Sequence, residues 1–102
     1  MIPNFKINTL KGPNPDNMII DLDGFYNHMM YFILYAKMLH PEENSLWNDE
    51  QVLCRFIDEK KNTYTSTLEE DGYGASLEKC LIYFERMEEY EKCKLIKHIQ
   101  KQ

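Results

Sequence analysis

The sequence predicts a small all-α domain of three to four helices behind an irregular N-terminal arm. The 102-residue chain is 43% hydrophobic and 13% aromatic, which is enough for one packed core. Three of its four prolines lie within the first 15 residues, so the remainder is almost free of helix breakers. Apolar residues then recur at spacings of three and four in two long segments. We therefore expect an arm over residues 1–17 and a single helical domain over residues 18–102.

The arm is expected to be irregular, with at most a short strand around Phe5 and Ile7, because "KGPNPDN" stops any regular element. The strongest helix prediction covers residues 22–39. Its start can be capped by Asp21 or Asp23, and Pro41 disfavours helix in the residue before it. Apolar residues at helical spacing support this prediction: Phe25, Met29, Phe32, Ile33, Ala36 and Leu39.

The middle of the chain is predicted to form a loop, a second helix and another loop. Ser45 or Asn48 can cap the helix, and an apolar face supports it: Val52, Leu53, Phe56 and Ile57. Residues 62–76 are predicted to be a loop. Residues 64–67 have β preference, but the sequence offers them no clear partner strand.

The C-terminal segment, which Ser76 can cap, carries two apolar stripes. The second stripe is rotated by about 100° from the first. Helix propensity favours one long helix, whereas the rotation favours two helices with a turn near residues 86–89. We predict that residues 77–99 form a helical hairpin. The stripes are Leu77, Cys80, Leu81, Phe84 and Met87, then Tyr90, Cys93, Ile96 and Ile99.

"IIDLDGFY" raises the question of a metal site at Asp21 and Asp23. "DLDG" resembles the first motif of haloacid-dehalogenase phosphatases, and "DLDGFY" resembles the entry motif of translesion polymerases. The phosphatase motif has Thr or Val where Phe25 stands, and it implies a parallel α/β sheet with a downstream Lys and a further acidic pair. We expect the two aspartates to serve the helix N-terminus rather than a metal ion.

The three cysteines and three histidines do not predict a catalytic or zinc site. An odd cysteine number argues against a closed disulfide framework and is consistent with a reducing compartment. No C-x-x-C or H-x-x-x-H pair occurs, and Cys93 and His98 fall on different helix faces. We expect no catalytic residue, no metal and no cofactor.

"LEKCLIYFERMEEYEKCKLIKHI", residues 77–99, resembles the helical hairpin of the UVR domain in excision-repair proteins. Tyr90 and Glu91 match its aromatic-Glu step, Cys93 its small residue, and Leu95, Ile96 and Ile99 its apolar tail. The paired alanines and the Arg-Asp of that motif are missing. The resemblance implies a two-helix hairpin that contacts protein.

Charge and residue usage predict a binding protein. A net charge of −5 argues against direct nucleic-acid binding. The longest apolar run, residues 29–36, is too short to span a membrane. The N-terminal residues do not resemble a secretion signal, so we expect a cytoplasmic protein. The surplus of tyrosine and methionine predicts contact with another protein or a second copy. The predicted partner-binding residues are Tyr26, Met30, Tyr31, Leu34, Tyr35 and Met38.

The leading hypothesis is thus a non-enzymatic adaptor, inhibitor, or phage or bacterial accessory factor. One alternative is an acidic nucleic-acid mimic that blocks a basic groove, which requires its carboxylates to line up in space. A remote alternative is a metal-dependent hydrolase that uses Asp21 and Asp23. The mimic would use Glu69, Glu70, Asp71, Glu85, Glu88, Glu89 and Glu91.

Overall fold

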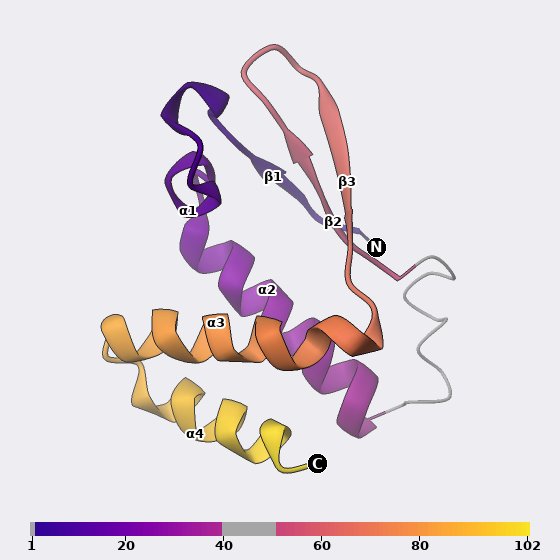
Figure 1. Ribbon diagram of the computed structural model, residues 1–102, viewed down its shortest axis with the longest axis vertical. Coiled ribbons are helices and arrows are strands. Elements are labelled where there is room, and N and C mark those ends of the chain that lie inside the picture. The colour runs from indigo at the N-terminus through magenta and orange to yellow at the C-terminus, as the bar shows by residue number, and fades with distance from the viewer. Residues whose placement is uncertain (1, 40–50) are drawn as a thin grey trace.

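The protein has an α/β fold, so the all-α prediction is wrong. The computed structural model describes residues 2–39 and 51–102. A three-stranded mixed sheet packs against one end of a central helix, which two further helices cover (Figure 1). The elements are β1 (Asn4–Lys6), η1 (Thr9–Lys11), α1 (Pro15–Met18), α2 (Leu22–Leu34), η2 (Tyr35–Leu39), β2 (Val52–Ile57), β3 (Thr63–Thr67), η4 (Glu70–Gly72), α3 (Tyr73–Arg86) and α4 (Tyr90–Gln100).

The sheet has the strand order β1-β2-β3 and includes two segments for which we predicted other structures. β1 runs parallel to β2, with Phe5 opposite Phe56, and β3 runs antiparallel to β2, with Tyr64 opposite Phe56. The helix predicted over residues 52–57 is therefore a strand, and the predicted loop contains β3. Both edges of β2 are paired, so a short apolar run suits it, and periodicity cannot distinguish such a run from a helix segment.

The turn between β2 and β3 is built around the carboxylate of Asp58, which is only 6% exposed. Its Oδ1 accepts hydrogen bonds from the backbone N–H groups of Lys60 (2.9 Å) and Asn62 (2.8 Å). Its Oδ2 accepts from the Tyr64 hydroxyl at 2.9 Å. Lys61 takes a left-handed conformation with φ 69°. A loop without glycine therefore closes the hairpin through its side chains.

Helix α2 begins at the predicted cap. Asp21 Oδ1 accepts from the Gly24 N–H at 3.0 Å, so the capping prediction is confirmed for Asp21. A Cβ at Gly24 would lie 2.2 Å from Asp21 Oδ2, which explains the glycine in the first turn. α2 and the π-helix η2 together span the predicted range of residues 22–39.

The break between α3 and α4 falls where the rotated stripes predict it. Glu88 takes a left-handed conformation with φ 59°. The Glu89 N–H bonds the Phe84 carbonyl (2.9 Å) and the Glu88 N–H bonds the Glu85 carbonyl (3.1 Å), which is the Schellman pattern. The hairpin over residues 77–99 is confirmed, whereas the UVR resemblance stays a prediction. Ser76 is not the cap, because α3 begins at Tyr73.

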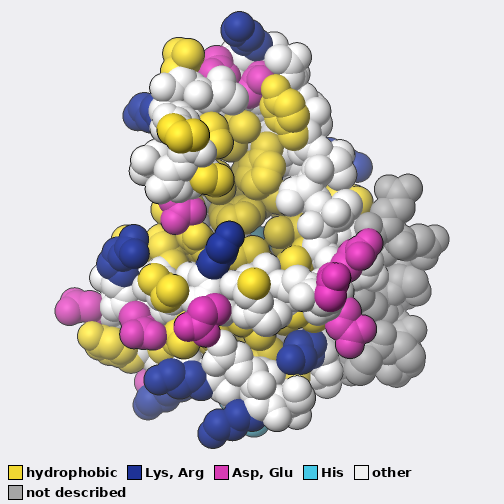
Figure 2. Space-filling view, viewed as in Figure 1, with side chains coloured by type: hydrophobic (Ala, Val, Ile, Leu, Met, Phe, Trp, Pro, Cys, Tyr) yellow, Lys and Arg dark blue, Asp and Glu magenta, His cyan; other side chains and the backbone are white. Residues whose placement is uncertain are grey.

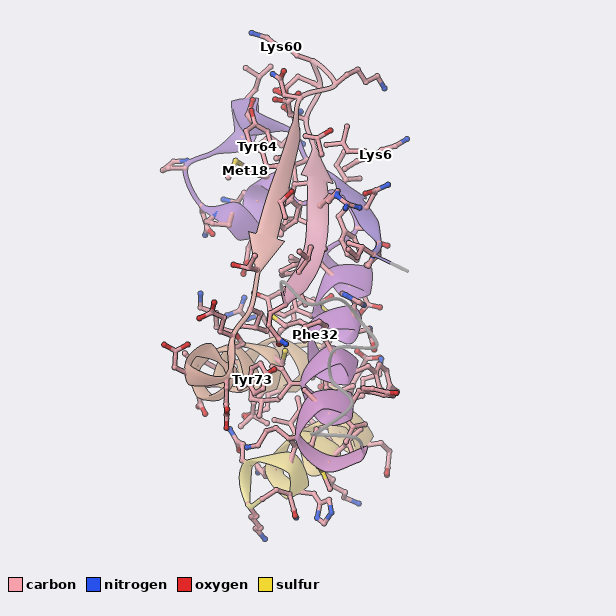
Figure 3. All side chains as sticks on the ribbon, turned by 90° about the vertical axis from the view of Figure 1, so that its right-hand side faces the viewer. Lys6, Met18, Phe32, Lys60, Tyr64 and Tyr73 are labelled. Atoms are coloured by element: carbon pink, nitrogen blue, oxygen red, sulfur yellow. The ribbon has the colours of Figure 1, made fainter. Side chains whose placement is uncertain are left out.

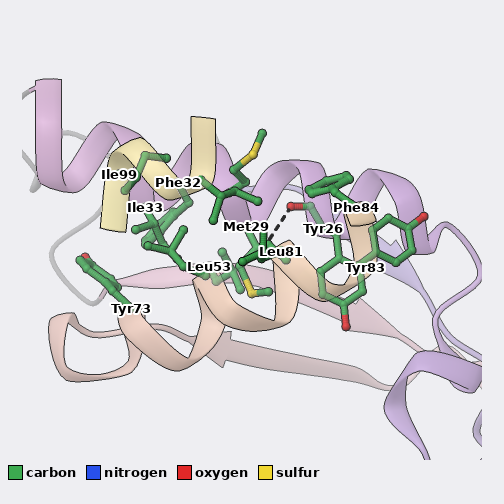
Figure 4. Close-up of a cluster of buried hydrophobic side chains, with 14 of the residues drawn as sticks. Tyr26, Met29, Phe32, Ile33, Leu53, Tyr73, Leu81, Tyr83, Phe84 and Ile99 are labelled. Atoms are coloured by element: carbon green, nitrogen blue, oxygen red, sulfur yellow. Dashed lines mark hydrogen bonds between the residues drawn. The ribbon is translucent and has the colours of Figure 1, made fainter. Parts of the chain in front are cut away.

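The core surrounds α2, which contacts the sheet on one side and α3 on the other (Figures 1 and 4). The T-shaped pair of Phe5 and Phe25 (5.7 Å between ring centroids) and the contact of Phe25 with Phe56 (5.6 Å) join α2 to β1 and β2. The residues with the least exposed side chains come from α2, β2, α3 and α4: Met30, Phe32, Ile33, Cys54, Leu77, Cys80, Phe84, Ile96 and Ile99. The predicted caps Ser45 and Asn48 lie outside the described residues.

Candidate functional site: a cleft between α1 and α3

A cleft of about 220 Å³ lies between α1 and the second half of α3. It belongs to a hollow with an apolar floor that separates α3 from the arm and the sheet, and basic side chains lie along the α3 side of this hollow (Figure 2). The cleft is lined by Asn14, Pro15, Asp16, Tyr26, Lys79, Ile82, Tyr83 and Arg86.

Two stacked tyrosines form the floor of the cleft. The rings of Tyr26 and Tyr83 lie 4.5 Å apart between centroids with an interplanar angle of 19°. The Tyr26 hydroxyl donates to Asp16 Oδ1 at 2.9 Å, and the Tyr83 hydroxyl donates to Asp23 Oδ1 at 3.1 Å. These contacts join α1, α2 and α3, and Figure 4 shows both rings next to Phe84 at one end of the core. The floor is therefore held in place from three elements.

The two phenols of the floor are neutral at physiological pH. The pKa of Tyr83 is raised to about 12, first by burial and second by its hydrogen bond to Asp23. Burial also raises the pKa of Tyr26, with its bond to Asp16 as the second cause. Both groups act as hydrogen-bond donors that hold neighbouring carboxylates, and neither is poised for proton transfer.

The α3 rim of the cleft carries two cations around an apolar side chain. Ile82 lies three residues after Lys79, and Arg86 lies seven residues after it, so the three side chains share one face of the helix. Ile82 is 49% exposed. Neither Lys79 nor Arg86 forms an ion pair with any residue in the described ranges. The rim thus offers two positive charges and an apolar contact to a ligand.

The aspartates of "DLDG" are occupied with the start of α2. Asp21 caps the helix, and Asp23 accepts from Tyr83 and from the Asn27 side-chain amide. Within residues 2–39 and 51–102, no group of three or more His, Cys, Asp or Glu is arranged to hold a metal ion. The two carboxylates that a hydrolase would need are therefore engaged in structural hydrogen bonds.

The thiols are buried and His28 is partly buried. All three cysteines are free and buried. Burial raises the pKa of Cys54 and of Cys80 to about 12, and it raises that of Cys93 as well, so thiolates do not form at neutral pH. His28 Nε2 lies 2.7 Å from the Leu53 carbonyl, to which it donates, and burial lowers the pKa of His28.

The predicted partner-binding face of α2 is largely inside the protein. Tyr26 is 4% exposed and Met30 is 0% exposed, so these two residues cannot form a free surface. Tyr31 is about half exposed, whereas Leu34, Tyr35 and Met38 are partly buried. The cause is the central place of α2, because a helix that is apolar nearly all round fits between two packed layers.

Sequence reasoning missed the α3 rim. The signal was the pair of basic residues on the outward face of a strongly amphipathic helix, together with Ile82 on that face. This signal is weak, because solvated helix faces commonly carry such charges. Only the position of α1 against α3 turns the face into one wall of a cleft.

The acidic residues of the proposed mimic fall into two groups. One group precedes α3, and the other extends from the C-terminal end of α3 through the turn into the first turn of α4. The 14 residues of α3 separate them by about 21 Å at 1.5 Å per residue. They do not form one continuous stripe. The groups are Glu69, Glu70 and Asp71, and Glu85, Glu88, Glu89 and Glu91.

Comparison of the chain with protein-family models, with curated proteins and with solved structures gives no match. Of the helices in the described part of the chain, none is both long enough and apolar enough to cross a membrane.

Proposed function

We propose that the chain is a non-enzymatic protein-binding module that holds an acidic segment of a partner protein in the cleft between α1 and α3. One observation carries the proposal. Two cations without ion-pair partners among the described residues, Lys79 and Arg86, flank the exposed side chain of Ile82 above a floor fixed by stacked tyrosines. A fixed floor lowers the ordering cost of binding, because the receptor side chains are already in place.

The spacing of the cations defines the ligand that fits. Seven residues of α3 place the backbones of Lys79 and Arg86 about 10 Å apart. In an extended peptide every second side chain lies on the same face, so residues i and i+4 share a face and lie about 13 Å apart. Two carboxylates four residues apart, with an apolar side chain midway between them, therefore match Ile82 and the two cations, whose long side chains take up the small difference in spacing. Asp16 on the opposite wall repels carboxylates, which keeps them on the α3 side.

The net charge of −5 opposes an acidic ligand at long range. Salt reduces this repulsion, because exposed charges more than about 10 Å apart are largely screened at 0.1 M. The local contacts to Lys79 and Arg86 then decide the affinity. The guanidinium of Arg86 can bind a carboxylate through two parallel hydrogen bonds, which favours an ordered complex.

We place this activity in the cytoplasm. The support is the free, buried state of all three cysteines, which suits a reducing compartment. The nucleic-acid mimic is the less favoured function, because its acidic residues lie at the two ends of α3.

The proposal is tested by an NMR titration of the full chain with a synthetic peptide that carries Glu-Ala-Leu-Ala-Glu. We expect shifts of the Lys79, Ile82 and Arg86 amides, and at least about tenfold weaker binding by Lys79→Glu/Arg86→Glu, since each lost charge contact is replaced by repulsion. The control Lys97→Glu/Lys101→Glu makes the same charge change at the C-terminal end of α4, where Lys101 is the residue after the helix, and should bind as the unmodified chain does. Equal loss in both variants, or no shifts at the cleft, would contradict the proposal.

A further inference from the structure

The strand β3 forms an edge of the sheet and is exposed along nearly its whole length (Figures 1 and 3). Edge strands present unpaired backbone groups, and proteins commonly protect them with proline, with charged side chains on the strand or with a covering segment. The sequence of β3 is Thr-Tyr-Thr-Ser-Thr, which has strong β preference and contains neither proline nor charge. The strand itself therefore carries none of the usual protective side chains.

The hydrogen-bond pattern shows which backbone groups of β3 face outward. The Asp58 N–H bonds the Asn62 carbonyl at 3.0 Å before the strand, and the Leu68 N–H bonds the Gln51 carbonyl at 2.9 Å after it. Antiparallel pairing alternates between residues that bond the partner strand and residues that do not. Tyr64 and Ser66 consequently bond β2. The N–H and C=O groups of the three threonines point to the edge of β3 that pairs with no other strand within residues 2–39 and 51–102: Thr63, Thr65 and Thr67.

We propose that β3 pairs antiparallel with β3 of a second copy, centred on Thr65, so that the two sheets become one. This register uses all three outward-facing threonines and forms about six backbone hydrogen bonds between the copies. Thr65 faces Thr65 of the second copy, and Thr63 faces Thr67. Threonine pairs across strands are favourable on a sheet surface.

The same register brings opposite charges together beyond the ends of the strand. Residue numbers that face each other sum to a constant, so Lys61 faces Glu69 of the second copy at the end of the paired segment. Lys60 lies in the hairpin turn and Glu70 begins η4, so their charges flank this pair without belonging to the paired strands. All four side chains are exposed, and none forms an ion pair with a described residue of its own chain. Glu69 has an extended backbone, with φ −98° and ψ 168°, so it continues the strand direction.

This complementarity is why we assign the edge to a second copy and not to an unrelated peptide. Each feature is self-matching: threonine faces threonine, and the lysine tip of one hairpin faces the glutamates of the other. Two-fold symmetry repeats every contact. A pairing of two short strands buries less than a standard interface, so the dimer forms reversibly at high concentration.

The first test is sedimentation equilibrium of the full chain up to about 1 mM. Thr65→Pro removes an outward N–H that β2 does not use, so circular dichroism should stay unchanged while association weakens at least about tenfold. The charge contacts provide a second test that does not depend on proline. Lys60→Glu/Lys61→Glu and Glu69→Lys/Glu70→Lys should each self-associate less, and an equimolar mixture of the two should recover the dimer.

Dimerisation through β3 and peptide binding in the cleft can be tested independently, because different variants affect them. Lys79→Glu/Arg86→Glu should dimerise as the unmodified chain does, because its changes lie outside β3 and the hairpin. A chain that stays monomeric at about 1 mM would overturn the dimer. So would association that survives both Thr65→Pro and the charge reversals, and so would a mixture that recovers nothing.

Discussion

Replacing Tyr83 by phenylalanine removes only the hydroxyl that donates to Asp23 Oδ1 at 3.1 Å. The ring keeps its place in the stack with Tyr26. A hydrogen bond within a protein contributes about 0.5–1.5 kcal/mol net. Because Asp23 is exposed to water, which competes for its carboxylate, we expect Tyr83→Phe to lower the free energy of unfolding by about 1 kcal/mol. Tyr83→Ala also loses the buried ring and should cost about 3–5 kcal/mol.

A double-mutant cycle isolates the contact between the two side chains. Tyr83→Phe, Asp23→Ala and the double variant are unfolded with urea and followed by circular dichroism. We expect a coupling energy of about 0.5–1 kcal/mol, because either single change already removes the hydrogen bond. Tyr90→Phe is the matched control, since Tyr90 is 59% exposed, and it should leave stability unchanged.

If the two changes are additive within about 0.3 kcal/mol, the hydroxyl and the carboxylate do not interact and the expected coupling is wrong. The same experiment addresses the metal hypothesis. Millimolar Mg²⁺ should not change the stability of the unmodified chain, whereas a rise that Asp23→Ala abolishes would assign the aspartates to a metal site.

Three further predictions concern pH and backbone conformation. Burial lowers the pKa of His28, so the unfolded chain takes up a proton at a higher pH than the folded chain does. Stability therefore falls as pH drops below about 6.5, and His28→Gln should reduce this loss of melting temperature. Glu88→Gly relieves a left-handed residue and should add about 0.5–1 kcal/mol in urea unfolding, while Glu85→Gly inside α3 should destabilise. Burial alone would raise the pKa of Asp58, but its hydrogen bonds outweigh burial and lower the pKa. The carboxylate therefore contributes stability above about pH 3.9, and this contribution is lost as pH falls through the pKa of the folded state. Asp58→Asn should reduce the fall of melting temperature at acidic pH.

Each of these predictions has an outcome that contradicts it. Identical slopes of melting temperature between about pH 7 and 5.5 for the unmodified chain and His28→Gln would mean that His28 titrates normally. A destabilised Glu88→Gly would argue against the left-handed turn. If the melting temperature of Asp58→Asn falls at acidic pH as steeply as that of the unmodified chain, the Asp58 carboxylate does not stabilise the hairpin.

The three long helices α2, α3 and α4 could be predicted from the sequence because their signals are local, whereas α1 falls at the end of the segment expected to be irregular. The apolar spacing of residues 22–39 and the rotated stripes of residues 77–99 depend only on near neighbours. β2 could not be predicted this way, because its partner β1 lies about 50 residues earlier and its turn to β3 is closed by Asp58 rather than by glycine. Residues 52–57 are mostly apolar and stand next to good helix formers, so the sequence of this segment resembles that of a helix.

In the candidate site, too, only contacts between residues close in sequence could be predicted. Asp21 was predictable as a cap because it bonds a backbone group three residues away. The cleft was not, since Lys79 and Arg86 become one wall of it only through the position of α1. Tyr26 and Met30 were assigned to a free surface because the sequence does not show that α2 lies between the sheet and α3.

We expect a partner protein to contact the chain at the cleft between α1 and α3. Photo-crosslinking tests this contact, with benzoylphenylalanine in place of Ile82 on the rim, or in place of Lys97 on α4 as the control, in cells of the native host. We expect one crosslinked partner from position 82 that disappears with Lys79→Glu/Arg86→Glu, and none from position 97. Crosslinks from position 97 alone, or a partner at position 82 that is retained after the charge reversal, would mean that the cleft is not the contact surface.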